Sequence, residues 1–379
     1  MEAPHQIGKN KTNRRRTRCG RTTQRNRLYT FPRQRGLPGV DSAMAVNLNF
    51  PLNRIGASEE HAEGVFLEPL SMLIRQKRTW SAALLFGFLW HAVTNIGAHR
   101  KVLRVFKHPA LAEAVRRDPR LPFKHLTHDF LVRGFTIPAR AACLMHHYKR
   151  LHSALPDLLL CRILRSEIPL VDFHEGGHFI ISIGPSWSSH KEGELSLNLH
   201  VDGEVVYVLS FTIVPGWVVE STAPEILLIS RIQGVKGCYP QISQATSALH
   251  GVAPAPLLFA ALQGVAGALG IHAMAAVSAV RQIAYEEQYA AAFHTAYDAF
   301  FAEMGIAATG AGFFLSALPI AEKPLTSIKQ GHKLRTREKR AFKQEIESAC
   351  AGFFADICAQ SSTFPEPGTC ANLLPGAVP

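Results

Sequence analysis

The sequence predicts an α+β (α/β) protein, in which an N-terminal helical region precedes a mixed β-sheet with packed helices. Three features of the hydrophobic pattern support this prediction. Apolar residues recur at helical spacing over 65–164, and they alternate with polar residues over 195–211. A long helical pattern then lies between two apolar runs, 225–232 and 271–278, which indicates a strand, a helix and a parallel strand.

The composition is that of an ordinary globular protein with a basic N-terminal arm. Of the 379 residues, 47% are hydrophobic and 18% are charged, which is sufficient for one large or two average domains with buried cores. Collagen-like, wholly disordered and small disulfide-scaffold proteins are therefore excluded. The formal charge is +12, but residues 1–40 contain 11 Lys and Arg and one Glu, which leaves 30 basic and 28 acidic residues elsewhere.

Changes of composition predict five segments. They are a disordered basic arm over 1–45, a helical region over 46–165, a mixed α/β domain over 166–325, a basic amphipathic helix over 326–360 and a disordered tail over 361–379. The arm could bind nucleic acid or anionic lipid by counterion release, but we expect a solvated arm and no specific nucleic-acid partner. In an alternative interpretation, Met44 is the true start and residues 1–43 are not translated.

Apolar stripes and prolines mark the helices of the first region. The stripes contain Phe66, Leu70, Leu73 and Ile74, then Leu84, Phe88 and His91, then Leu144, Tyr148 and Leu151. The prolines at 109, 119, 122 and 138 lie near the starts of helical runs, where a missing N–H costs least. This region is therefore predicted to be entirely helical.

The second region contains strands and helices in alternation. Asp202-Gly203 is a turn pair between two alternating segments and predicts a hairpin. A strand over 179–183 is expected before the hairpin, and a central strand over 225–232 after it. The remaining elements are helices over 241–250 and 254–269, a strand over 271–278, a helix over 289–304 ended by Gly305, a last edge strand over 312–318 and the amphipathic helix over 333–359.

The sequence predicts neither secretion nor a membrane span. Residues 9–35 lack the apolar run of a signal peptide, and the apolar stretch over 80–93 is too short to cross a bilayer. The stretch over 257–280 is interrupted by three glycines. Seven cysteines without a CxxC pair predict reduced thiols. We therefore expect a cytoplasmic protein, with an anionic surface such as the inner membrane as a candidate peripheral partner.

Two histidine groups raise the question of a metal site. His174-Glu175-Gly176-Gly177-His178 has the letters of the zinc-protease motif HExxH, which requires both histidines on one helical face. The two glycines disfavour a helix by roughly 2 kcal/mol relative to alanine, so a strand, a turn and a strand are expected. His146-His147 and His152 lie on a predicted helix, but adjacent residues point to different faces. We predict solvated or core-edge histidines and no metal site.

A glycine-rich turn, Arg231-Ile232-Gln233-Gly234-Val235-Lys236-Gly237, follows the central strand and precedes a helix that begins near Pro240. Backbone N–H groups and a helix N-terminus could hold a phosphate there. The turn and the order of elements around it resemble the acyl-CoA loop region of GCN5-related N-acetyltransferases. Two residues separate the glycines here, where that family has one, and an extra short helix precedes the long one.

This resemblance implies a cofactor and a set of site residues. The cofactor would be acyl-CoA or an acyl-carrier thioester, and Tyr297 would be the catalytic general acid. The cofactor-binding residues would be Arg231, Gln233, Gly234, Lys236 and Gly237.

Short motifs over about residues 65–345 resemble the VirK/YbjX family. They are Met145-His146-His147-Tyr148, Lys191-Glu192-Gly193-Glu194-Leu195, Leu209-Ser210-Phe211, Arg231-Ile232-Gln233-Gly234, Ala245-Thr246 through His250-Gly251, and Tyr297-Asp298-Ala299-Phe300 with Glu303. The resemblance implies a bacterial virulence-associated protein that supports placement of an outer-membrane actin-assembly protein and resistance to cationic antimicrobial peptides. Ser247 and Ala253 replace commonly basic positions and Phe301 a frequent Trp, so an anionic ligand at the basic positions would bind less well.

These observations leave two main functions open, and they are compatible. One is a VirK/YbjX-type role in cell-envelope or surface-protein function. The other is acyl-CoA-dependent acyl transfer, because acylation of a lipid or a protein would alter the envelope. Binding of nucleic acid or anionic lipid through the basic arm is a third alternative, and the sequence alone does not decide whether the protein is an enzyme.

Overall fold

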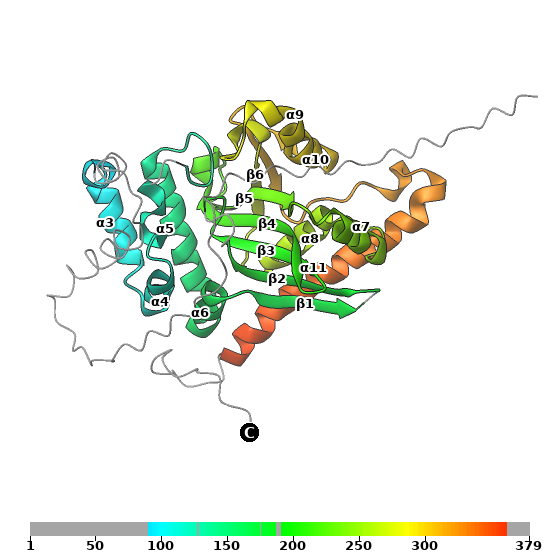
Figure 1. Ribbon diagram of the computed structural model, residues 1–379, viewed down its shortest axis with the longest axis horizontal. Helices are drawn as coiled ribbons and strands as arrows, with labels where there is room; N and C mark the ends of the chain where they lie inside the picture. The colour runs from blue at the N-terminus through cyan, green and yellow to red at the C-terminus, as the bar shows by residue number, and fades with distance from the viewer. Residues whose placement is uncertain (1–89, 127–128, 175, 187–190, 362–379) are drawn as a thin grey trace, which may run out of the picture.

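Within the residues that the structure describes, a mixed sheet of eight strands forms the centre of an α+β fold (Figure 1). This computed structural model describes residues 90–126, 129–174, 176–186 and 191–361. The fold class predicted from the sequence is therefore confirmed. The basic arm, the helical stripes before residue 90, most of the apolar stretch over 80–93 and the C-terminal tail lie outside the described residues, and their predictions stay predictions.

The sheet combines an antiparallel meander with one parallel pair. The strands are β1 Ile168–His174, β2 His178–Pro185, β3 Leu195–Val201, β4 Glu204–Pro215, β5 Glu225–Gly234, β6 Ala273–Val277, β7 Ala307–Ala308 and β8 Phe313–Ala317, in the spatial order β1-β2-β3-β4-β5-β6-β8-β7. Neighbours from β1 to β5 are antiparallel, whereas β5 and β6 are parallel, as predicted. Asp202 and Gly203 both have positive φ, 50° and 87°, which is the geometry of a tight hairpin turn.

One predicted strand position is wrong. The strand expected over 312–318 is β8, but it is not at the edge, because β7 pairs antiparallel with its outer side. β7 has only two residues, which is too short to leave a period of two in the sequence. The hydrophobic pattern of the sequence therefore does not reveal β7.

Four α-helices before the sheet lie wholly within the described residues: α3 Ile96–Val105, α4 Pro109–Arg117, α5 Ile137–Ala154 and α6 Asp157–Arg165. A short 3-10 helix, Leu121–Leu126, connects α4 to the segment before α5. Pro109 begins α4 and Pro138 lies in the first turn of α5, where their missing N–H groups have no helical acceptor. Thr136 caps α5 by accepting from Ala139 N at 3.4 Å.

The helices that follow β5 lie against the sheet and each other. α7 Tyr239–Ala248 and α8 Pro254–Ala268 connect β5 to β6, and α11 Lys333–Ser361 crosses the molecule next to α8 (Figure 1). A Cβ on Gly264 of α8 would overlap the carbonyl oxygen of Glu347 in α11, so glycine permits their close packing. The helix predicted over 289–304 consists of α9 Ala290–Phe293, a π-helical turn His294–Ala299 and α10 Phe300–Glu303.

A search of the described residues finds no helix with the length and apolar content needed to span a bilayer.

Candidate functional site

The parallel strands β5 and β6 separate soon after they meet. They pair only from Leu227 opposite Met274 to Ile229 opposite Ala276. At this point β5 contains a bulge, because Ile229 lies opposite Phe211 of β4 and Arg231 lies opposite Ser210, with Ser230 between them. A bulge bends and twists a strand. The last residues of β5 therefore extend beyond β6 with one backbone edge that β6 does not pair.

Side chains occupy the edge that β6 leaves. Gln282 is fully buried and donates through Nε2 to the carbonyl oxygen of Ser230. Tyr297, from the π-helical turn, is also buried and takes a backbone hydrogen bond from Ile232. Buried backbone groups need partners, and these two side chains supply them where a neighbouring strand would otherwise do so.

A partly buried ion pair borders the same edge. Arg231 Nε lies 3.6 Å from Glu192 Oε2, and both side chains are 12% exposed. With its amide oxygen turned toward Arg231, Gln233 accepts from Arg231 Nε at 3.0 Å and from Nη2 at 2.7 Å. The guanidinium of Arg231 is thus engaged by Glu192 and Gln233.

The environment of Tyr297 favours its protonated form. Burial, followed by the carboxylate of Glu192, raises the pKa of Tyr297 far above its usual range. The phenol therefore keeps its proton at neutral pH and can act as a hydrogen-bond donor or a proton donor. Asp298 accepts from the backbone N of Ala279 at 2.8 Å, which fixes the π-helical turn against the end of β6.

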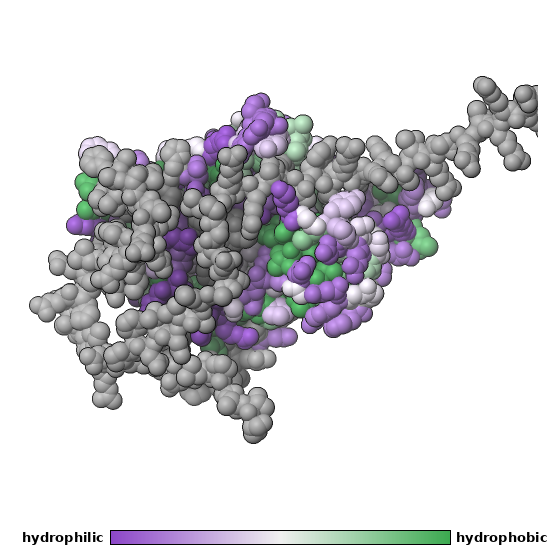
Figure 2. Space-filling view, in the orientation of Figure 1, coloured by the Kyte–Doolittle hydropathy of each residue, from purple (hydrophilic) through white to green (hydrophobic). Residues whose placement is uncertain are grey.

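A cavity of about 1160 Å³ lies beside the end of β5. Ile232, Gln233 and Gly234 form its strand wall, and Tyr207 of β4, which pairs with Gly234, lies next to them. Apolar side chains from α8 and from the helix over 290–303 line much of the remainder, including Phe259, Ala260, Ala296, Phe300 and Met304. Charged residues at the rim come from the 322–323 segment and α11, including Lys323, Arg340 and Lys343. A hydrophobic area bordered by hydrophilic residues is visible between α7 and α10 (Figure 2).

The structure separates the predicted cofactor-binding residues into two groups. Gln233 and Gly234 line the cavity, and Arg231 is held in the partly buried ion pair beside it. Lys236 and Gly237 are exposed in the turn before α7, where Gly237 has a φ of 92°. Tyr297 itself does not line the cavity, although its neighbours Ala296 and Ile232 do. The assignment of these residues to catalysis and cofactor binding stays a prediction.

Sequence reasoning missed three members of this site. In the sequence, Tyr207 is one position of an alternating strand, and Glu192 is one residue of a family motif. Gln282 follows β6 in a segment with no pattern of its own. No spacing relates these residues to Tyr297, because only the divergence of β5 from β6 brings them together.

Tyr148 and Glu194, from the first two VirK/YbjX-like motifs, meet in a separate buried network. Lys124 Nζ lies 3.0 and 3.1 Å from the two carboxylate oxygens of Glu194, and the Tyr148 hydroxyl donates to Glu194 Oε2 at 2.5 Å. Burial raises the pKa of Glu194, and the charge of Lys124 opposes this. The network joins α5 to the entry of β3 and has a structural role.

The histidine predictions have mixed outcomes. His174 and His178 are cross-strand partners in the β1–β2 hairpin, so the predicted strand, turn and strand are confirmed. His146 is partly buried and lies 3.3 Å from Glu225. His147 is not at the core edge but fully buried, and its Nδ1 accepts from Ile213 N at 3.1 Å. Burial lowers the pKa of His147 to about 3.

Comparison with known proteins relates the chain to a family without an assigned activity. A family model described as "Protein of unknown function (DUF535)" matches residues 78–351. This range contains the divergence of β5 and β6, the cavity and the Lys124–Glu194 network. No curated protein and no solved structure matches the chain significantly.

Proposed function

The chain belongs to the DUF535 family, which is the VirK/YbjX family that its motifs resemble, and from this premise we propose that it is an acyltransferase that uses an acyl thioester. The observation that carries the proposal is the end of β5, which extends beyond β6 beside a large, mostly apolar cavity. An extended ligand with amide groups would pair with the last residues of β5, beyond the backbone groups that Gln282 and Tyr297 already bond, as an added strand does. The pantetheine arm of CoA or of an acyl-carrier protein has this chemistry.

The two ends of the cavity suit the two ends of such a ligand. The apolar wall of α8 and the helix over 290–303 suits an acyl chain. The exposed turn with Lys236 and Gly237, which follows the cavity residue Gly234 along the chain, suits phosphate groups. The order of antiparallel strands, bulge, turn, helices and parallel strand supports the resemblance to GCN5-related N-acetyltransferases, which we retain as part of this proposal.

Tyr297 would act on the leaving group. The nucleophile of the acceptor attacks the thioester carbonyl and the C–S bond breaks, while Tyr297 transfers its proton to the departing sulfur. The proton that the acceptor's nucleophile loses then returns the tyrosine to its neutral form. A phenol whose pKa is raised by burial is protonated at the start of this cycle.

A VirK/YbjX-type role in the cell envelope is compatible with this chemistry. Acylation of a lipid or a surface protein would change envelope composition, which would account for surface-protein placement and peptide resistance. The acceptor would then be a lipid or protein amine or hydroxyl that approaches the cavity rim.

Gly234→Trp is expected to abolish binding of CoA thioesters. A side chain at Gly234 would enter the space between Ile242 and Tyr207 at the cavity wall, since a Cβ there already lies 2.8 Å from Ile242 Cδ1. A thermal-shift assay with acetyl-CoA and palmitoyl-CoA should give the unaltered protein an increase of about 5 °C at ligand concentrations near 100 times Kd. Gly267→Trp is the control, because Gly267 is exposed on α8 with open space around its Cα. No shift in the unaltered protein, or the same shift in Gly234→Trp, would contradict the proposal.

Tyr297→Phe is expected to lower kcat by about 10²–10⁴-fold while thioester binding is retained. The substitution keeps the buried ring and removes the hydroxyl, which carries the proton that the leaving sulfur would receive and accepts a backbone hydrogen bond from Ile232. Release of free thiol from an acyl-CoA in the presence of an amine acceptor measures the rate. An unchanged kcat would show that Tyr297 is not the general acid.

A further inference from the structure

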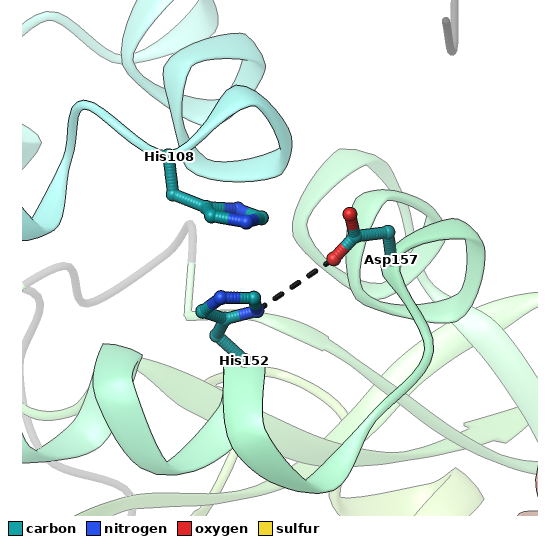
Figure 3. Close-up of side chains that lie close together, drawn as sticks. All are labelled: His108, His152 and Asp157. Carbon is teal, nitrogen blue, oxygen red and sulfur yellow. Dashed lines mark ion pairs between the residues drawn. The ribbon is translucent and has the colours of Figure 1, made fainter. Parts of the chain in front are cut away.

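Three helices of the N-terminal region bring His108, His152 and Asp157 together (Figure 3). His108 precedes α4 as its N-cap residue, His152 lies in the last turn of α5, and Asp157 begins α6. The ring centroids of the two histidines are 3.6 Å apart, and His152 Nδ1 lies 3.6 Å from Asp157 Oδ1. One ligand atom from each residue lies within 4.8 Å of the others.

Local structure does not account for the histidine at position 108. N-cap positions favour Ser, Thr, Asp and Asn, whose side-chain oxygens accept from the first turn of the helix. His108 makes no such bond, and among the described residues its buried Nδ1 has no hydrogen-bond partner. Asp157, in contrast, is favoured at a helix N-terminus by the helix dipole. We therefore expect the imidazole ring of His108 to bind a ligand.

We propose that His108, His152 and Asp157 bind a divalent transition-metal ion, with Zn²⁺ as the chemical fit. Imidazole nitrogen and carboxylate oxygen bind zinc at about 2.0–2.2 Å. Ligand atoms around a tetrahedral ion are therefore about 3.4 Å apart. The ligand atoms of the three residues lie within 4.8 Å of one another, so small side-chain movements would bring them to this separation. The side chains of His152 and Asp157 are 42% and 55% exposed, so the fourth position would be open to water.

The ion would stabilise the arrangement of α4, α5 and α6. Its three ligands come from three separate elements, so binding would join them more strongly than the single His152–Asp157 ion pair does. The role is structural and is independent of the acyltransferase proposal, because these residues do not line the β5 cavity.

A second group of similar chemistry provides an internal control. Asp172, His174 and His178 also lie within 4.8 Å of one another, but all three belong to the single β1–β2 hairpin. His178 Nε2 already lies 2.8 Å from Asp172 Oδ1, and the three side chains are 38–73% exposed. A metal ion here would join only two strands that are already paired in one hairpin.

The test is a calorimetric titration of the full-length, chelator-treated protein with Zn²⁺. We expect one zinc equivalent for the unaltered protein and for His174→Ala, and an affinity at least tenfold lower for His152→Ala and for Asp157→Asn. Asp157→Asn preserves size and the first residue of α6, so it remains informative if His152→Ala fails to fold. When the His174→Ala variant is titrated with Co²⁺, we expect the visible absorption that is typical of tetrahedral Co²⁺. Absence of zinc binding in the unaltered protein, or binding lost in His174→Ala but kept in Asp157→Asn, would overturn the proposal.

Discussion

Lys124→Met is expected to lower the free energy of unfolding by about 3–5 kcal/mol, a large part of the total stability of a domain. The Lys124 and Glu194 side chains are 7% and 0% exposed, and the ammonium contacts both carboxylate oxygens. Methionine retains most of the side-chain volume but leaves a fully buried carboxylate without its counter-charge. Urea unfolding monitored by circular dichroism measures the change.

A double variant separates the charge effect from loss of packing. Lys124→Met with Glu194→Gln removes both charges and keeps an acceptor for the Tyr148 hydroxyl. We expect it to recover more than half of the loss, because replacing a complete buried pair costs less than breaking it. Two results would contradict this account. One is a free energy of unfolding of Lys124→Met within about 1 kcal/mol of that of the unaltered protein. The other is a loss in the double variant as large as the sum of the losses in the two single variants.

Acidification from pH 7.5 to pH 5 is expected to cost about 4 kcal/mol of unfolding free energy through His125 and His147. Burial lowers the pKa of each to about 3, so both stay neutral in the native state. The unfolded chain takes up protons below its ordinary histidine pKa of about 6.5. This stability is therefore fully present above pH 6.5 and is lost progressively as the pH falls toward 3. Burial also lowers the pKa of His99, to about 4, which adds in the same direction.

His147→Gln is the variant that tests the pH effect. Glutamine can accept from Ile213 N, as His147 Nδ1 does, but it does not titrate. Between pH 6 and pH 4 the pH dependence of the unfolding free energy should become smaller by about 1.4 kcal/mol per pH unit. Urea unfolding at a series of pH values provides the measurement, and an unchanged slope in the variant would show that His147 is protonated in the native state.

Much of the fold could be predicted because each element carries its own local pattern. The hairpin of β3 and β4 combines alternation with a turn that requires two positive φ angles. The α8 segment has a helical apolar stripe and lies between two apolar strand segments. Because a strand–helix–strand connection makes a right-handed crossover, this order predicts that β5 and β6 are parallel. β7 lacked such a pattern because of its length.

Burial of the polar positions of the sheet was not predictable from alternation. Ser196, Asn198 and Ser210 are nearly or fully buried, although a half-buried sheet would expose them. Ser210 and Ser186 hydrogen-bond at 3.0 Å, and Thr212 Oγ1 accepts from Glu194 N at 3.1 Å. A period of two distinguishes the faces of a strand, but it does not show whether a second layer covers the polar face.

The sequence by itself determined the fold class, the family and most of the elements after residue 90, with β7 as an exception, because periodicity, turn residues and motifs are properties of short segments. Tertiary structure alone decided the site. Glu192, Tyr207, Gln282 and Tyr297 come from segments far apart in the chain, and they meet at one edge because β5 bulges at Ser230 and separates from β6. The same reason applies to His108 and His152, since only the packing of α4 and α5 with α6 places their rings side by side.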